Sequence, residues 1–396
     1  MKGSIAEKGA GKWLVRVYAG RVEGKTTHVN RTVHGSKREA QLALAKLVAE
    51  VSAGKVLAGQ AITVTQLILR WLDDVSPQRT PRTIHEYRRL ATHDIFPALG
   101  TKRIDRLTAR DIDSYYRSLL EHGLSPASIR RSHALLHASL GRAVKWGLIG
   151  TNPVDRVSPP TTRRPQVTAP SVTDVTKLIA AARGREDSVL STAIALAAVT
   201  GMRRGELCGL RWSDVDPHQR RLTVSRSLTV TPGQIHIGDT KTHQTRDVAL
   251  DPAMIGLLDE RRLEQEKYAR TVGTELVSDP YVLSRDADGS RPCLPDGLGR
   301  AYWRLARQSA IPTRFHDLRH FSATQLVGAG IDIRTVAGRL GHADASTTLR
   351  VYSHLLAERD RAAAEHLGAL ALGAKSRITA SAAPYILPEP RECGSH

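Results

Sequence analysis

The sequence predicts a mainly α-helical fold with small β elements (α+β): a small N-terminal β-sheet and helix module, a helical bundle, and a mixed α/β C-terminal domain. The chain has 396 residues and is 41% hydrophobic, which is enough for several cores. After residue 62, apolar residues recur at helical spacing through most of the chain. Strand-like alternation is confined to short segments, between residues 13 and 33 and between residues 221 and 250.

The charge of the chain indicates a polyanionic partner. Lysine and arginine number 58 against 39 acidic residues, which gives a net charge of +19, and the isoelectric point is near 10.3. This balance is typical of proteins that bind nucleic acid. Three scattered cysteines do not suit a disulfide framework or a zinc site, and no run of 18 apolar residues is present. The sequence therefore predicts a cytoplasmic protein that binds nucleic acid and has no membrane partner.

Residues 1–56 are expected to form the N-terminal module. Residues 13–18 and 28–33 alternate as strands on either side of a glycine-containing turn. Ser36 is placed to cap a helix running to about Val51, with Glu39 three residues after the cap. Eleven lysines and arginines against four glutamates give this segment a charge of +7. A solvated basic surface explains that charge, and so does a sheet that lies in a DNA groove.

Residues 62–157 are expected to form a bundle of four or five helices. The helices are expected to start at Thr63, Thr80, Thr108 and Ser125, with Thr63 and Thr108 as N-caps. Basic residues are spread over these helices, as solvated faces or as contacts to phosphates: Arg82, Arg88, Arg89, Arg130, Arg131, Arg142 and Lys145. The proline-rich basic segment 158–165 is the expected linker to the next domain.

The C-terminal domain, residues 166–373, is predicted to begin with helices. Ser171 caps the first helix, and a strongly apolar helix, 189–199, ends at Gly201. The next helix begins around residue 202 and carries Arg203 and Glu206 at a spacing of three residues. The carboxylate of Glu206 can orient the guanidinium of Arg203, although an ordinary helical ion pair has the same spacing.

Three β segments follow, at residues 221–231, 234–238 and 245–250. The turn Pro232-Gly233 joins the first two. Residues 239–244, between the second and the third, are predicted to be a polar hairpin tip that carries Lys241. A lysine at such a tip is usually only solvated, but a mobile tip can present its ammonium as a proton donor. Helices are expected at 251–271 and 301–310, with a short strand at 281–284.

Histidine, arginine and tyrosine residues gather between residues 316 and 352. His316, Arg319 and His320 have the spacing of one helix face. His342 lies just after Gly341, which is suited to end a helix, and a further helix from about residue 344 carries Tyr352.

Ordinary helix packing would explain each of these residues alone, but their combination favours an active site. A metal site is disfavoured, because no cysteine or carboxylate completes a zinc-type spacing and the neighbouring arginines would repel a cation.

Five short motifs together resemble the signature boxes of the tyrosine recombinase, or phage integrase, family. They stand in the family's order and spacing: TGMRRGEL (200–207), TKT (240–242), HDLRH (316–320), LGH (340–342) and YSH (352–354). The resemblance implies that residues 1–56 bind arm-type DNA sites, that residues 62–157 bind the core site, and that residues 166–373 form the catalytic domain. Residues 374–396 match nothing in the family and are expected to be a disordered tail.

The resemblance implies a site-specific recombinase that cuts and rejoins DNA through a 3′-phosphotyrosyl intermediate, to integrate and excise a mobile element or prophage. It assigns six catalytic residues: Arg203 and Arg319 to the phosphate, Lys241 to the leaving 5′ oxygen, His316 to the tyrosine proton, His342 to the phosphate, and Tyr352 as nucleophile. Glu206 and His320 are implied as supporting residues, Arg204 as a DNA contact and Asp317 as structural. No cofactor, metal or ATP is implied, because the phosphotyrosyl bond keeps the energy of the broken bond.

The implied partners are double-stranded attachment sites, a homotetramer assembled on them through a Holliday junction, and directionality or DNA-bending proteins. The implied location is the cytoplasm, in association with the nucleoid. An apolar stripe in residues 355–372 suits packing on a neighbouring subunit and on the chain's own core equally well.

The same chemistry would serve a conjugative element, chromosome resolution or a type IB topoisomerase. The extra N-terminal module argues against a minimal resolvase and against the topoisomerase. A non-catalytic DNA-binding relative is a further alternative, but such a protein would be expected to have lost some of the six residues.

Overall fold

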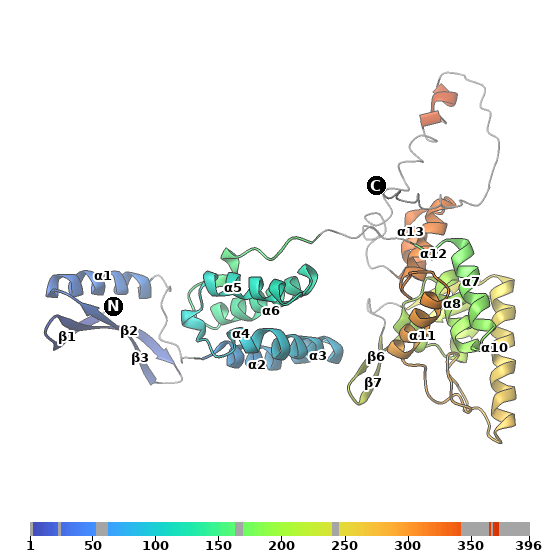
Figure 1. Cartoon of the computed structure of the whole chain (residues 1–396), viewed down its shortest axis with the longest axis horizontal. Coiled ribbons are helices and arrows are strands. Elements are labelled where there is room, and N and C mark those ends of the chain that lie inside the picture. Colours follow the sequence, from blue (N-terminus) through green and yellow to red (C-terminus); the bar gives the residue numbers. More distant parts are fainter. Residues whose placement is uncertain are drawn as a thin grey trace. The chain divides into compact units, whose positions relative to one another are not determined.

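The computed structural model describes residues 3–22, 25–52, 62–162, 169–239, 245–341, 364–365 and 367–371. The chain divides into two compact units, Met1–Arg164 and Pro165–His396 (Figure 1). Lys241, His342 and Tyr352 lie outside the described residues, as do the helix predicted from residue 344 and most of the predicted helix 355–372.

The first unit begins with an antiparallel sheet in the order β1-β2-β3, followed by one helix. The elements are β1 (Gly3–Gly9), β2 (Lys12–Val22), β3 (Lys25–His34) and α1 (Lys37–Ser52). Val15 and Val17 alternate toward α1, where they are buried with Leu47. Ser36 caps α1 with Glu39, as predicted. Both predicted strands are confirmed as β2 and β3. β1 was not predicted, because it has a single partly buried position and therefore lacks an apolar alternation.

The helical part of the first unit has its own core. Its helices are α2 (Val64–Val75), α3 (Pro81–Leu90), α4 (Phe96–Leu99), α5 (Ala109–Glu121) and α6 (Pro126–Lys145), with short turns of helix at Ser76–Gln78, Ala91–Ile95, Ile104–Arg106 and Pro153–Arg156. The hydroxyls of Thr63, Thr80, Thr108 and Ser125 each accept a hydrogen bond from the backbone three residues on, which confirms the predicted caps Thr63 and Thr108. The apolar stripes of these helices, including Ile68, Ile112 and Leu136, meet in this core.

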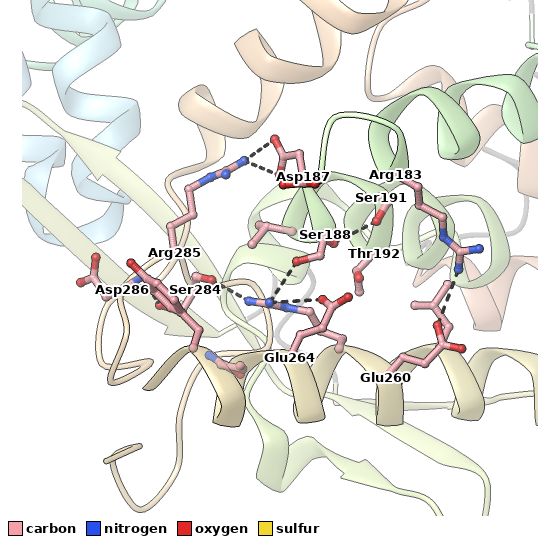
Figure 2. Close-up of a pocket in the computed structure, with 16 residues that line it drawn as sticks. Arg183, Asp187, Ser188, Ser191, Thr192, Glu260, Glu264, Ser284, Arg285 and Asp286 are labelled. Carbon is pink, nitrogen blue, oxygen red and sulfur yellow. Dashed lines mark hydrogen bonds and ion pairs between the residues drawn. The ribbon is translucent and has the colours of Figure 1, made fainter. Parts of the chain in front are cut away.

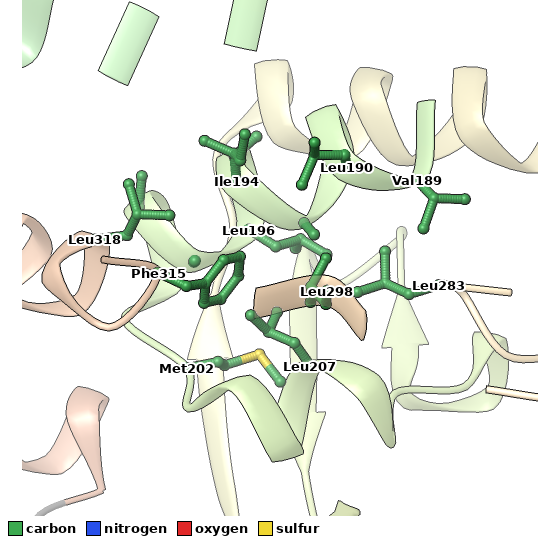
Figure 3. Close-up of a cluster of buried hydrophobic side chains, with 14 of the residues drawn as sticks. Val189, Leu190, Ile194, Leu196, Met202, Leu207, Leu283, Leu298, Phe315 and Leu318 are labelled. Carbon is green, nitrogen blue, oxygen red and sulfur yellow. The ribbon is translucent and has the colours of Figure 1, made fainter. Parts of the chain in front are cut away.

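The second unit is organised around α8 (Ser188–Thr200), whose side chains are buried on nearly every side. This burial explains why the helix is apolar all round rather than along one stripe. Its neighbours are α7 (Val172–Arg183), α9 (Arg204–Cys208), α10 (Pro252–Thr271), α11 (Pro295–Gln308) and α12 (Asp317–Gly328). Figure 3 shows Ile194 and Leu196 of α8 among the side chains of Leu207, Leu298 and Phe315.

The β segments of this unit form two small sheets. One has the order β4-β5-β8 and the other pairs β6 with β7. The strands are β4 (Val215–Asp216), β5 (Arg221–Val224), β6 (Arg226–Thr231), β7 (Gln234–Asp239) and β8 (Arg246–Ala249), and a turn of helix spans Trp212–Asp214. The turn at Pro232-Gly233 joins β6 to β7 as predicted. The prediction of one strand over residues 221–231 was wrong, because a break at Ser225 sends its two halves into different sheets.

The prediction of a hairpin tip at residues 239–244 was also wrong. β8 pairs with β5, which places Val248 opposite Leu222, and both side chains are buried. β7 exposes Ile235 and Ile237 and offers β8 no comparable burial. The strand predicted at 281–284 is reduced to a single bridge between Arg211 and Tyr281.

The last described helices are α12 and α13 (Ile333–Leu340), which share a small core of Ala323, Val327, Val336 and Leu340. Asp332 caps α13. Gly341 ends the helix, as predicted, with a left-handed φ of 70°. α11 begins six residues before the predicted start, at Pro295 rather than residue 301. Among the described residues, no helix is long and apolar enough to cross a membrane.

Candidate active site

Arg203 lies in the short connection between α8 and α9. Gly201 ends α8 with φ 65°, and a β-carbon at Gly201 would lie 2.3 Å from Leu340 Cδ2. Only glycine therefore allows both the left-handed turn and the close approach of α13. The chain then places Arg203 at the N-cap of α9, with its side chain 23% exposed.

Glu206 orients Arg203, as the three-residue spacing indicated. The carboxylate receives the backbone N–H of Arg203 at 2.9 Å and its Nη1 at 2.8 Å. Its second oxygen also receives Nη2 of Arg246 at 2.6 Å. Burial alone would raise the pKa of Glu206, but the hydrogen bonds and charges of Arg246 and Arg203 outweigh it, and the pKa lies below the usual 4.5. A buried, ionised carboxylate thus lies between two arginines.

Arg319 enters the same place from α12. It is 4% exposed, and its Nη1 donates to the carbonyl of Gly201 and to that of Leu340, both at 2.6 Å. Arg319 therefore links the end of α8 to the end of α13. A guanidinium suits this position, because its several donors point in fixed directions and its charge is permanent.

Three arginines converge on the C-terminal end of α13. Carbonyls at a helix C-terminus lack partners within the helix and carry the negative end of its dipole, which favours cations. Here three consecutive carbonyls each accept from a different arginine: Arg339 from Arg246 Nε at 3.0 Å, Leu340 from Arg319 Nη1 at 2.6 Å, and Gly341 from Arg203 Nη2 at 2.8 Å. The helix end concentrates positive charge directly before residue 342.

His316 and His320 lie beside this cluster. His316 is the N-cap of α12 rather than a residue within it, and its ring lies edge-on to His320 with the centroids 5.1 Å apart. Desolvation, then the charges of His320 and Arg319, lower the pKa of His316 to about 4, although solvent still reaches the side chain. The pKa of His320 is also lowered, mainly by burial. Both imidazoles are therefore neutral at pH 7 and able to accept a proton.

Of the predicted site residues, the structure brings together Arg203, Glu206, His316, Arg319 and His320. Asp317 pairs with Arg314 and serves the start of α12, as expected for a structural residue. Arg204 makes an ion pair with Asp296 at 3.0 Å. Lys241, His342 and Tyr352 stay predictions, because they are outside the described residues.

Arg246 is the residue that sequence reasoning missed. A signal was present: residues 246, 248 and 250 alternate, and Val248 and Leu250 are buried. The period of two puts Arg246 on the core-facing side of β8, where an unpaired charge would be costly. An arginine at such a position calls for a buried acidic partner, and Glu206 is that partner.

A cavity of about 740 Å³ lies elsewhere in this unit, beside the start of α8 and along α10 (Figure 2). None of the predicted catalytic residues lines it. Its polar groups are engaged with one another: Arg285 holds Asp187 through two hydrogen bonds, and Arg261 reaches Ser188 and the carbonyl of Ser284. These contacts join α8, α10 and the 284–286 loop, so the lining is explained by packing.

Comparisons with known proteins agree with the fold. The phage integrase family model matches residues 171–359, and the model of the phage integrase N-terminal SAM-like domain matches residues 63–120. The chain is 26% identical over 341 residues to the ICEBs1 integrase of Bacillus subtilis (strain 168), with 85% of this chain and 91% of that one covered. It is also 26% identical over 397 residues to a XerC-like tyrosine recombinase of Caldanaerobacter subterraneus, with 93% and 99% covered.

Solved structures show the same fold. The Tn1549 transposon integrase in complex with transposon right end DNA is similar, with a TM-score of 0.66, 22% identity, and coverage of 78% of this chain and 100% of that one. A lambda integrase in a tetramer bound to a Holliday junction is also similar, with a TM-score of 0.58 and 18% identity. The match covers 87% of this chain and 94% of that one. Together with the sequence relatives, these likenesses define a tyrosine-type site-specific recombinase. The chain belongs to the phage integrase family.

Proposed function

We propose that this chain is an integrase that cuts and rejoins double-stranded DNA attachment sites through a 3′-phosphotyrosyl intermediate at Tyr352, so that a mobile element enters and leaves a chromosome in the cytoplasm. The observation that carries the proposal is the meeting of Arg203 and Arg319 at the end of α13, beside a neutral His316. Two arginines whose directions are fixed in advance suit the non-bridging oxygens of a phosphodiester.

The proposed reaction balances without an added cofactor. The Tyr352 oxygen attacks phosphorus and its proton passes to His316, while the bond to the 5′ oxygen breaks and Lys241 gives that oxygen a proton. Arg203, Arg319 and His342 hold the phosphate as negative charge grows on its oxygens. Rejoining is the reverse of this step with a 5′ hydroxyl from the other duplex, so the bond energy is conserved.

Assembly and arm binding are proposed on separate grounds. The relatives include a lambda integrase tetramer on a Holliday junction, which supports a tetramer on DNA for this chain. The sheet face opposite α1 exposes Arg16, Tyr18, His28 and Asn30, which supports the proposal that residues 1–56 bind arm-type DNA. A XerC-like role in chromosome resolution is the second candidate, favoured by the named XerC-like relative. Directionality or DNA-bending proteins are expected as additional partners.

The test is covalent capture of DNA. Duplexes selected from random sequence by binding to the full-length chain are nicked at successive positions, incubated without metal or ATP, and run on a denaturing gel. An SDS-resistant adduct on the 3′ side of the break is expected for the wild type and for Tyr268→Phe, a matched change at an exposed tyrosine of α10. The adduct is expected to vanish in Tyr352→Phe while DNA binding persists.

Two results would contradict the proposal. An adduct that survives Tyr352→Phe would place the nucleophile elsewhere. Tight binding without any wild-type adduct on the nicked duplexes would favour a non-catalytic DNA-binding relative.

A further inference from the structure

Arg246 lies inside the arginine cluster, yet none of the proposed chemical steps uses it. Its side chain is 9% exposed and its partner Glu206 is fully buried. Nη2 donates to Glu206 Oε2 at 2.6 Å and Nε donates to the carbonyl of Arg339 at 3.0 Å. One guanidinium therefore spans the carboxylate that orients Arg203 and the helix end that receives Arg203.

By binding both groups, Arg246 fixes the distance between Glu206 and the end of α13, and the position of Arg203 depends on that distance. Arg203 is held on one side by Glu206 and on the other by the carbonyl of Gly341. Arg246 joins the same carboxylate to the same helix end, two residues before Gly341. Without Arg246, Arg203 would be the one arginine still bound to Glu206. The end of α13 would also lose one of its three arginine contacts.

Gly341 shows how closely Arg246 packs against this helix end. A β-carbon at Gly341 would lie 2.7 Å from Arg246 Nη1, so the glycine leaves room for the guanidinium as well as for its own left-handed φ. Within the described part of the chain, Nη1 is buried without a hydrogen-bond partner. The guanidinium is therefore held at this helix end through Nε and Nη2.

The place of Arg246 in the sequence adds a second connection. Arg246 begins β8, five residues after Lys241 in the sequence. The contacts of Arg246 therefore tie the C-terminal side of the segment that carries Lys241 to the arginine cluster.

We propose that Arg246 is a positioning residue: it holds Glu206, and through it Arg203, against the end of α13, and thereby sets the rate of DNA cleavage without contributing to DNA affinity. This inference rests on the proposed function. A misplacement of about 1 Å by a residue remote from the reacting atoms lowers a rate about 10²-fold.

The test compares Arg246→Gln and Arg246→Lys with Arg226→Gln in the full-length chain. Arg226 is the matched control, since it pairs at 2.8 Å with Asp214, whose side chain is only 8% exposed, and it lies on β6. The single-turnover rate of adduct formation is measured on the selected nicked duplexes. Kd is measured at several salt concentrations, and Tm is recorded for each variant.

Arg246→Gln is expected to slow adduct formation about 10²-fold, with Kd and its salt slope unchanged. Arg246→Lys is expected to recover part of the rate, because an ammonium keeps the charge but not the fork that reaches two partners. Combining Arg246→Gln with Glu206→Gln is expected to add little further loss, since both act through Arg203.

Several outcomes would overturn the proposal. A salt slope lower by about 0.9 would make Arg246 a direct phosphate contact. An equal rate loss in Arg226→Gln, or losses in Arg246→Gln and Arg246→Lys that follow only their Tm, would make the effect one of general stability. A normal rate of adduct formation in Arg246→Gln would refute the positioning role but not the proposed function. A wild type that forms no adduct would refute the proposed function itself.

Discussion

Arg203 and Gly341 are 138 positions apart in the sequence, and Nη2 of Arg203 donates a 2.8 Å hydrogen bond to the carbonyl oxygen of Gly341. The bond joins the start of α9 to the end of α13, so two motifs that are remote in the sequence meet in one place. It also orients the guanidinium before any DNA arrives. Electrostatic preorganisation of this kind is usually the largest single contribution to an enzyme's rate enhancement, because the donors need not reorient during the reaction.

Arg203 and Arg319 are predicted to contribute equally to the cleavage rate but unequally to the stability of the fold. Arg203→Ala and Arg319→Ala should each reduce the rate of adduct formation by about 10²–10³-fold. Arg319→Ala also strips the carbonyls of Gly201 and Leu340 of a buried donor, which costs about 1–3 kcal/mol. Urea denaturation should therefore show a loss of stability for Arg319→Ala and a smaller one for Arg203→Ala. A mild effect of either variant on cleavage would count against the phosphate assignment.

The imidazole of His316 is predicted to stay neutral well below pH 6.5. Its pKa is lowered to about 4 by desolvation and by the charges of His320 and Arg319. The unfolded chain, with an ordinary value near 6.5, takes up the proton first. The stability conferred by neutral His316 is thus complete above about pH 6.5 and is lost as the pH falls toward 4. Because the side chain is partly exposed, this loss should be small.

An NMR titration of labelled histidines checks this prediction, with the His316 signal assigned by its absence in His316→Gln. A midpoint near 6.5 would refute it. The rate of adduct formation by the wild type should likewise show no loss with a midpoint near pH 6.5 between pH 7 and pH 5.5.

Gly201 is predicted to be needed for the approach of α13 as well as for its φ. Gly233 has a similar φ of 76° with nothing near its missing β-carbon, whereas a β-carbon at Gly201 would strike Leu340. Gly233→Ala should cost about 1–2 kcal/mol for the left-handed backbone alone. Gly201→Ala should cost about 1–3 kcal/mol more from overpacking and should also slow cleavage. Equal losses of unfolding free energy in Gly201→Ala and Gly233→Ala, measured by urea denaturation, would show that Leu340 moves aside at no measurable cost.

Removal of the N-terminal module is predicted to separate two kinds of DNA binding. The module has its own core around Val15, Val17 and Leu47, distinct from the core of the helical bundle. A chain that begins at residue 57 should keep adduct formation on core-site duplexes and lose affinity for distal arm sites. Arg16→Ala in the full chain is the matched point change on the exposed sheet face. Loss of adduct formation on truncation would show that the module belongs to the core-site machinery.

Much of this fold was predictable because its signals are local. Caps such as Thr63 and Asp332, and the glycine end of α13 at Gly341, depend on neighbours within four residues. The pairing of Arg203 with Glu206 was predictable for the same reason. The motifs also indicated the family, because the five boxes stand in order along the chain.

The features that were not predicted depend on distant parts of the chain. β8 pairs with β5 rather than β7 because Val248 and Leu222 bury each other, and local alternation does not contain that choice. The role of Arg246 required the position of Glu206, 40 residues earlier in the sequence. Local patterns identify which residues are apolar or charged, but partners across such a separation come only from the assembled fold.

The small core between α12 and α13 determines how easily the arginine cluster comes apart. Among the described residues, four buried side chains, Ala323, Val327, Val336 and Leu340, make a core separate from the large one around α8. Segments that rest on so little apolar burial open at a lower free energy than the whole domain. Opening of α13 would release the carbonyls of residues 339–341 from three guanidinium groups together. Amide hydrogen exchange along this single helix would then report whether the phosphate-binding arginines are assembled or dispersed.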